Sequence, residues 1–374
     1  MEPQRIYAKI NTGAIAHNIK LIKSKIGKSL FMLIVKADGY GHGAAAISQK
    51  FEDAADYFAV AETGEAMELR AAGIRKPILI LGYTSPSLYE TALANDITLT
   101  LFSLRGARLL SEKAAAMGKT ARVHFAVDTG MGRIGWQVCE KDAAEAAAAA
   151  KLPYIEPEGI FSHFATADES DTAFAQEQRA SFERFCAMLA ERGVKIPLRH
   201  MNNSAGIMRF SEQYGMVRAG ILAYGLYPAE NLAAEFAHSF PLRPAMELIT
   251  HIAHIKELEE GKTVSYGATY KTARKTLVAT LPVGYADGYP RALSSRGEVI
   301  LHGVRCPIIG RVCMDQMMVD ITAVPQAKVE DAVTLVGKSG GEFISAEEIA
   351  ALAGTINYEF ICGIAKRVPR IYTE

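Results

Sequence analysis

The chain has 374 residues, of which 49% are hydrophobic and 22% are charged, and its formal net charge is zero. This composition is typical of a soluble globular protein that is long enough to form two substantial hydrophobic cores. The balanced charge argues against general electrostatic attraction to nucleic acid or to an anionic membrane.

Membrane, signal and metal-binding features are also missing from the sequence. No apolar stretch approaches the ~18 residues that a membrane helix needs, and no apolar signal region follows residues 1–5. The cysteines are widely spaced and form no Cys-x-x-Cys pair. They predict reduced thiols in a cytoplasmic protein, with neither a disulfide framework nor a metal site. They are Cys139, Cys186, Cys306, Cys313 and Cys362.

Short apolar runs alternate with helix-forming segments up to about residue 225. Alternating apolar residues over 6–10 predict a first strand, and Thr12 is the expected N-cap of a helix with isoleucines at positions 15, 19, 22 and 26. Further strands are predicted at 30–35, 57–60, 77–81, 98–102, 122–127, 158–162, 199–202 and 216–221. Helices are predicted at 64–72, 104–117, 142–150 and 171–192, the last between Ser170 as N-cap and Gly193 as C-cap.

Eight strands followed by helix-forming sequence fit a parallel (β/α)8 barrel, although a doubly wound open sheet would alternate in the same way. Beyond about residue 240, helix signals are scarce. Strands are predicted there at 264–270, 276–282, 298–301, 317–321 and 332–336. The predicted fold class is an α/β barrel plus β. The N-terminal (β/α)8 barrel covers 12–240, and a C-terminal, mainly antiparallel β domain covers 241–374 with the N-terminal strand 1–11.

Lys36 is the first candidate for chemistry, because it ends the apolar run 30–35 and precedes a glycine-rich stretch. A lysine next to apolar packing lies in a region of low dielectric constant, which favours the neutral form of its amine. The neutral amine is the nucleophilic form. Other polar clusters fall at the carboxyl ends of the predicted barrel strands, where barrel active sites form. These residues also have structural explanations. Lys36 could extend its charged end into solvent from a strand end, His163 could be a core histidine, and Asn203 could cap a helix.

Taken together, these strand ends suggest a cofactor with two points of attachment. Ser204 and the pair Gly220 and Ile221 would lie after the seventh and eighth strands, which is the usual phosphate corner of a barrel. A phosphate at that corner and an amine on the first strand match pyridoxal 5'-phosphate, which offers a phosphate and an aldehyde.

Nine motifs, spread over nearly the whole chain, resemble those of the alanine racemases. They are VKADGYGHG at 35–43, VDTGMGRIG at 127–135, NSA at 203–205, VRAGI at 217–221, YGLY at 224–227, VSYG at 264–267, PVGYADG at 282–288, GRVCMDQ at 310–316 and RVPR at 367–370.

The resemblance implies a pyridoxal-phosphate-dependent racemase with one proton carrier on each face of the substrate. Lys36 would serve the D-isomer and Tyr266, from the partner subunit of a homodimer, the L-isomer. His163, linked to Arg218, would help the tyrosine act as a base. Arg218 would face the pyridine nitrogen, stay protonated and so favour racemisation over transamination.

Further residues take their implied roles from the same resemblance. Arg133 would bind the substrate together with Met314 and Asp315, which come with Tyr266 from the partner subunit. Tyr285 and Tyr358 would narrow the entrance. Asp168, Arg291 and Arg311 would line the approach. The implied cofactor-binding residues are Lys36, Tyr40, Arg133, His163, Asn203, Ser204, Arg218, Gly220, Ile221 and Tyr358.

Two positions depart from the family pattern. Related enzymes often carry a carbamylated lysine where this chain has Ala126, so a chloride or another partner would have to orient Arg133. Asn202 stands where alanine is common.

Four functions remain open at this point. The first is alanine racemase, with D-alanine for the cell wall as the usual family role. The others are a racemase for serine or a broader range of amino acids, a decarboxylase of the same plan, and a non-catalytic pyridoxal-phosphate carrier.

Overall fold

The structure, a computed structural model, describes residues 5–374. Residues 1–4, which belong to the expected N-terminal segment 1–11, lie outside the described residues. The chain divides into two compact units. The barrel unit comprises Ile15–Gly39 and Ala44–Arg243. The β unit comprises the described residues up to Ala14, together with Tyr40–Gly43 and Pro244–Glu374.

Eight parallel strands form the centre of the barrel unit, in the order β10-β2-β3-β4-β5-β6-β8-β9. The backbone N–H groups of Gly215 and Arg218 donate to the carbonyls of Arg199 and Asn202, which brings the two ends of the sheet together. The predicted barrel is therefore confirmed, and the open sheet is excluded. The strands are β2 Leu30–Ile34, β3 Tyr57–Val60, β4 Ile78–Ile80, β5 Thr98–Leu101, β6 Ala121–Asp128, β8 Ile155–Phe161, β9 Leu198–His200 and β10 Met216–Ala219, and β7 Trp136–Gln137 pairs with β6.

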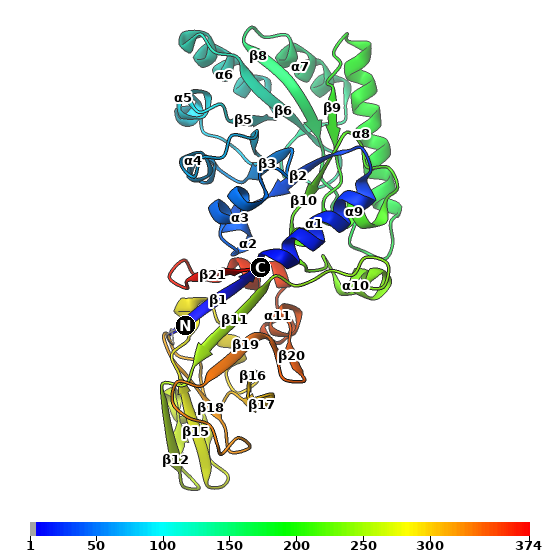
Figure 1. Ribbon diagram of the computed structural model, residues 1–374. Coiled ribbons are helices and arrows are strands. Elements are labelled where there is room, and N and C mark those ends of the chain that lie inside the picture. The colour runs from blue at the N-terminus through cyan, green and yellow to red at the C-terminus, as the bar shows by residue number, and fades with distance from the viewer. Residues whose placement is uncertain (1–4) are drawn as a thin grey trace. The chain divides into compact units, whose positions relative to one another are not determined.

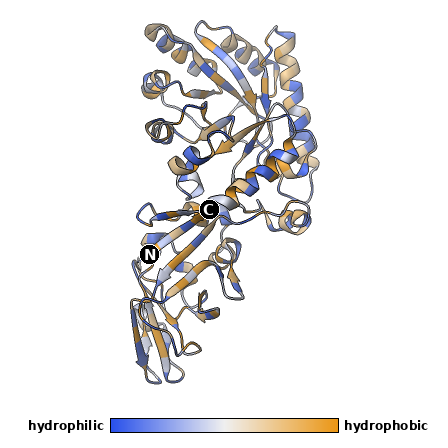
Figure 2. Ribbon diagram, viewed as in Figure 1, coloured by the Kyte–Doolittle hydropathy of each residue, from blue (hydrophilic) through white to orange (hydrophobic). Residues whose placement is uncertain are grey.

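Helices surround these strands, as Figure 1 shows. Hydrophobic and hydrophilic residues alternate along α8 (Figure 2), whose buried face includes Phe182, Phe185 and Leu189 at helical spacing. The predicted isoleucine face of α1 is likewise buried. The helices are α1 Thr12–Ile26, α3 Ala44–Phe51, α4 Thr63–Ala71, α5 Tyr89–Ala94, α6 Leu104–Met117, α7 Glu140–Ala150, α8 Ala173–Glu191, α9 Ser204–Arg209 and α10 Glu230–Phe236.

The N-caps predicted for α1 and α8 are wrong by one or two residues. The Asn11 side chain, not Thr12, accepts a hydrogen bond from the N–H of Ala14 at 2.7 Å. α8 begins after Thr172 instead of Ser170. Several short polar residues precede each helix, and local sequence does not decide which of them takes the cap. Gly193 does follow the end of α8 in a left-handed conformation, as expected for a helix end.

Antiparallel pairing dominates the β unit, which confirms the predicted mainly antiparallel domain. One sheet has the order β17-β16-β19-β11-β1-β21, with β20 paired to β19, and a smaller sheet has the order β12-β15-β18. β1 pairs with β21 in parallel. The strands are β1 Ile6–Asn11, β11 Met246–His251, β12 His254–Leu258, β13 Thr263–Val264, β14 Tyr270–Lys271, β15 Thr276–Leu281, β16 Glu298–Leu301, β17 Val304–Pro307, β18 Met317–Asp320, β19 Ala332–Ser339, β20 Glu342–Ile344 and β21 Arg370–Thr373.

One expectation for this unit is wrong. Residues 264–270 do not form one strand: β13 and β14 flank a short 3-10 turn, Tyr266–Ala268, because Ser265 and Gly267 adopt positive φ angles. Helices also occur, namely α11 Ala346–Ala353 and α12 Asn357–Cys362. α11 has recognisable end signals, a Ser345 cap and a left-handed Gly354.

Within residues 5–374, no helix combines the length and the apolar character that crossing a membrane requires.

Candidate active site

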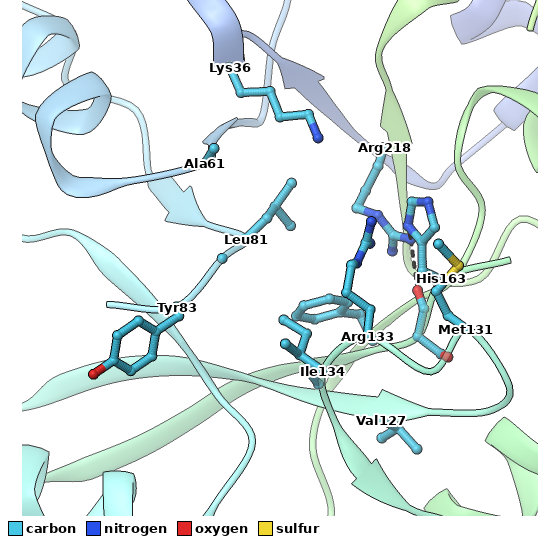
Figure 3. A pocket seen from close by; sticks show the side chains of 14 residues that line it. Lys36, Ala61, Leu81, Tyr83, Val127, Met131, Arg133, Ile134, His163 and Arg218 are labelled. Atoms are coloured by element: carbon cyan, nitrogen blue, oxygen red, sulfur yellow. Dashed lines mark hydrogen bonds between the residues drawn. The ribbon is translucent and has the colours of Figure 1, made fainter. Parts of the chain in front are cut away.

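A cavity of about 270 Å³ lies within the barrel unit, next to the carboxyl end of β2. Lys36 follows the buried strand at this end, and its side chain points into the cavity (Figure 3). Arg133 and Arg218 also line the cavity, and among residues 5–374 its lining includes no carboxylate. Three cationic side chains gathered around one cavity make this space attractive to an anionic ligand.

The chain turns sharply after Lys36 in a way that the sequence does not predict. Ala37, Asp38, Gly39 and Tyr40 all have φ between 52° and 62°, so they form a turn of left-handed helix. This conformation is unfavourable for residues other than glycine. Hydrogen bonds hold the turn: Asp38 accepts from the N–H of Ala44 at 2.9 Å, and Glu65 accepts from that of Ala37 at 2.6 Å.

Arg218 lies almost fully buried at the end of β10. Its Nη1 donates to Nδ1 of His200 at 3.0 Å, and its Nη2 lies 3.2 Å from Nδ1 of His163 and donates to the carbonyl of Ser162 at 2.7 Å. Burial and the nearby Arg133 lower the pKa of Arg218 to about 9. The guanidinium therefore stays protonated at neutral pH, and the expected link between Arg218 and His163 is present.

His163 is held as a neutral ring. Burial, together with the neighbouring cations Arg218, Arg133 and Lys36, lowers the pKa of His163 well below its ordinary value. Since Arg218 can only donate, Nδ1 of His163 must accept, and the ring proton lies on Nε2.

A tight turn after β6 carries Arg133. Oδ1 of Asp128 accepts from the N–H groups of Gly130 and Gly132, at 2.9 and 3.0 Å, and Oδ2 accepts from Gln137 at 3.1 Å. Among residues 5–374, no hydrogen-bond or ion-pair partner of the Arg133 guanidinium is found, and Ala126 lines the same cavity.

The ends of β9 and β10 lie close together, but the four residues predicted there do not line the cavity. Asn203 caps α9, with Oδ1 accepting from the N–H of Gly206 at 3.0 Å. Oγ of the buried Ser204 accepts from the N–H of Gly220 at 3.1 Å, and Ile221 follows at the start of a 3-10 turn. The segments after β9 and β10 therefore contain both the helix cap and the residues of the predicted phosphate corner.

Of the remaining predicted residues, Asp168 belongs to the barrel unit. The others belong to the β unit, namely Tyr40, Tyr266, Tyr285, Arg291, Arg311, Met314, Asp315 and Tyr358. The rings of Tyr40 and Tyr358 lie 6.2 Å apart between centroids. Burial and the nearby Cys362 raise the pKa of Tyr40, so its phenol stays protonated.

A surface pocket of the β unit brings together Tyr266, Met314 and Asp315. Tyr266 is 71% exposed and Met314 is 54% exposed. Asp315 accepts from Nη2 of Arg367 at 2.6 Å, and the N–H of Tyr285 donates to the carbonyl of Cys313 at 3.1 Å. The turn that carries Tyr285 is thus joined to the segment that carries Met314.

Three polar residues of the barrel interior were not identified from the sequence: His124, Glu158 and His200. His124 and His200 are fully buried and lie between Glu158 and Arg218. Histidines inside otherwise apolar strands are the signal that could have pointed to them.

Comparisons with known proteins cover almost the whole chain. Residues 10–228 match the family described as "Alanine racemase, N-terminal domain", and residues 245–372 match "Alanine racemase, C-terminal domain". An alanine racemase of Clostridium perfringens is 45% identical over 371 residues, which is 99% of this chain and 95% of that protein. A solved alanine racemase of Clostridium difficile 630 superposes with a TM-score of 0.95 at 42% identity, covering 99% of this chain and 96% of that one. A second structure of that protein, in complex with cycloserine, has a TM-score of 0.93 at 40% identity and covers 100% and 97% of the two chains.

Proposed function

Because the chain belongs to the alanine racemase family, we propose that it interconverts L-alanine and D-alanine with the help of pyridoxal 5'-phosphate. The observation that supports this most directly is the cavity that Lys36, Arg133 and Arg218 line together. A decarboxylase or a simple cofactor carrier fits less well, since the family match extends over both units.

The residues present fit the cofactor. Lys36 offers an amine for its aldehyde. The Ser204 hydroxyl, which accepts from the N–H of Gly220, can donate its own proton to the phosphate, and the N–H of Ile221 adjoins that of Gly220. Tyr40 keeps its phenol proton because burial raises its pKa, so its hydroxyl is a hydrogen-bond donor at neutral pH. When bound, pyridoxal phosphate draws electron density from the substrate Cα, so that the proton at this carbon becomes removable.

Two proton carriers complete the proposal. The Lys36 amine exchanges a proton with Cα on the D-face, and the Tyr266 phenol of a second subunit does so on the L-face. Inversion requires one base on each face, because a single base returns the proton to the side from which it came.

The neutral His163 assists the tyrosine. With Nδ1 accepting from Arg218, its Nε2–H group is available to donate to an oxygen. Such a donor stabilises a phenolate and makes the tyrosine a better base near neutral pH.

In this proposal Arg218 determines how strongly the bound cofactor would withdraw electrons from the substrate. A pKa of about 9 leaves it protonated at neutral pH, and it can donate to the ring nitrogen but cannot protonate it readily. Next to Arg218, the pyridine ring of the cofactor would withdraw electrons less strongly than it would next to a carboxylate. Reprotonation at Cα is favoured over side reactions such as transamination.

In this proposal Arg133 of one subunit and the backbone near Met314 of the second subunit hold the substrate carboxylate. Asp315 lies in the same surface pocket as Met314. Tyr285 and Tyr358 narrow the entrance, which favours a small side chain. Serine is the second candidate substrate, because one added hydroxyl is hard for a small pocket to reject.

A homodimer with shared sites explains the exposed aromatic surface of the β unit. Tyr266 and Tyr285 are 71% and 42% exposed, and together with Met314 they form an unusual group of solvent-facing apolar side chains. Burial of these residues against a second subunit would give them a function and remove this exposure.

A chiral assay of the purified protein with each amino acid tests the activity. Interconversion of the alanine isomers that depends on pyridoxal phosphate is expected, and faster turnover of serine than of alanine would overturn the assigned substrate. Lys36→Ala should abolish the visible absorption that the bound cofactor gives. An unchanged band in that variant would contradict the role of Lys36.

Two variants test the assignment of the faces. Tyr266→Phe should slow exchange of the Cα proton of L-alanine in deuterated water far more than that of D-alanine. Mixing inactive Lys36→Ala and Tyr266→Phe proteins should restore part of the activity if the sites are shared. Equal losses for both isomers, or no recovery in proven heterodimers, would count against this arrangement.

A further inference from the structure

A chain of four polar side chains crosses the interior of the barrel unit. Nη1 of Arg218 lies 3.0 Å from Nδ1 of His200, and Nε2 of His200 lies 2.8 Å from Nδ1 of His124. Nε2 of His124 lies 3.3 Å from Oε2 of Glu158. Four different strands contribute these groups, namely β10, β9, β6 and β8, and the mechanism above uses Arg218 alone.

The two ends of the chain fix the direction of every hydrogen bond in it. Arg218 can only donate, so Nδ1 of His200 accepts and its proton lies on Nε2. That proton is donated to Nδ1 of His124, whose own proton then lies on Nε2 and is donated to the Glu158 carboxylate, which can only accept. One tautomer of each ring satisfies all three contacts.

The charge states needed for this order are the ones that the surroundings favour. Burial lowers the pKa of His124 and lowers that of His200 well below its ordinary value, so both rings are neutral. Burial alone would raise the pKa of Glu158, but hydrogen bonds from His124 and Tyr57 lower it, so the carboxylate is ionised.

Close packing prevents the rings from turning. A Cβ at Gly159 would lie 2.6 Å from Nδ1 of His124, so the imidazole lies directly against the backbone of β8. Phe161 stacks on His200 at 4.9 Å between centroids, and the guanidinium of Arg218 lies 5.4 Å from the same phenyl ring.

We propose that Glu158, His124 and His200 are positioning residues that hold the Arg218 guanidinium in place from the far side of the barrel interior. The carboxylate selects the tautomer of both rings, and His200 thereby presents an acceptor to Arg218. With the opposite tautomer, an N–H of His200 would face an N–H of Arg218, and the guanidinium would move. The consequences of this arrangement for pyridoxal-phosphate binding and for activity rest on the function proposed above, whereas the directions of the hydrogen bonds do not.

Nitrogen NMR of histidine-labelled protein without cofactor tests the order directly. Both rings of the wild type should carry a proton on Nε2 and none on Nδ1. Tyr57→Phe is the matched control, because it removes a second donor to Glu158 but leaves the chain intact, and its tautomers should be unchanged. A proton on Nδ1 of either ring in the wild type would overturn the proposal.

Two substitutions of one histidine separate positioning from packing. His124→Asn retains an acceptor oxygen near the position of Nδ1, whereas His124→Leu removes it. The leucine variant should bind pyridoxal phosphate about tenfold more weakly and lose about tenfold in kcat, with an unchanged KM for alanine. The asparagine variant should stay near the wild type.

Equal losses in the asparagine and leucine variants would show a purely structural role and overturn the proposal. If neither variant folds, the wild-type tautomers still decide the question. Failure of the wild type to racemise alanine would refute the proposed function but leave the tautomer result standing.

Discussion

The carboxylate of Asp128 organises the turn that carries Arg133, and Asp128→Asn tests that arrangement. Three hydrogen bonds reach this carboxylate, from Gly130, Gly132 and Gln137, and the residue is only 8% exposed. The substitution keeps the shape of the side chain and removes its charge. We expect a less stable turn and a less well placed guanidinium.

The magnitude follows from the type of bond that is changed. A hydrogen bond to a charged group contributes ~1.5–3 kcal/mol and a neutral one ~0.5–1.5 kcal/mol, so each backbone bond to Asp128 should lose about 1 kcal/mol. The introduced amide also meets the amide of Gln137, which must turn over to offer its oxygen. The free energy of unfolding should fall by about 2–3 kcal/mol in total.

The dependence of this difference on pH can be worked out. Burial alone would raise the pKa of Asp128, but its hydrogen bonds lower it below the ordinary value. Stabilisation by a lowered carboxylate pKa is complete above the unfolded-state value of about 3.9 and is lost as the pH falls through the folded-state value. The difference in the free energy of unfolding between wild type and variant should therefore be largest at neutral pH and shrink below about pH 3.9.

Urea unfolding at neutral pH and at about pH 3.5 measures both quantities. Asp53→Asn, at an exposed position of the same unit, controls for the loss of one carboxylate. In the alanine assay, the Asp128 variant should also show a raised KM because Arg133 moves. An unfolding midpoint equal to that of the wild type at neutral pH, or a gap that does not depend on pH, would refute this reasoning.

Three further substitutions address the motif at 35–43 that contains Lys36, called the lysine motif below, and the predicted phosphate corner. Gly41→Ala should destabilise the protein by about 3 kcal/mol or more, since φ is 78° and the new Cβ would lie 2.1 Å from the carbonyl oxygen of Ile361; thermal unfolding measures the loss. Arg370→Met removes the donors to four backbone carbonyls, including that of Gly41, and should cost about 2–4 kcal/mol in urea unfolding. Ser204→Ala leaves the buried N–H of Gly220 without its acceptor, so it should cost about 1–3 kcal/mol and raise the dissociation constant for pyridoxal phosphate, as measured by absorbance titration.

The barrel could be predicted from sequence because its strands are short, apolar and bounded by turns. The predicted strands at 30–35 and 57–60 agree with β2 and β3 to within one residue at each end. The same rule fails in the β unit for β12, whose residues are mostly exposed, and for β21, which pairs in parallel with the distant β1. Those strands owe their existence to partners, which local patterns do not reveal.

The sequence identified residues at the cavity better than it identified what supports them. Lys36, Arg133 and Arg218 lie in motifs with unusual polar residues at strand ends, so they stand out in the chain. His124 and Glu158 lie inside strands, and their importance depends on contacts across the barrel interior. Periodicity places a residue on a face of a strand but does not indicate which polar group will meet it there.

The lysine motif also shows that nearness in sequence need not mean membership of one structural unit. Lys36 belongs to the barrel unit, whereas Tyr40–Gly43 belong to the β unit. Arg370 donates to the carbonyl of Gly41 from 329 residues away, and Tyr372 donates to that of His42. The left-handed turn between Lys36 and Tyr40 thus connects two cores, and substitutions in β21 act on the backbone that carries the Tyr40 phenol. A barrel fragment without β21 should therefore not retain the geometry of this motif.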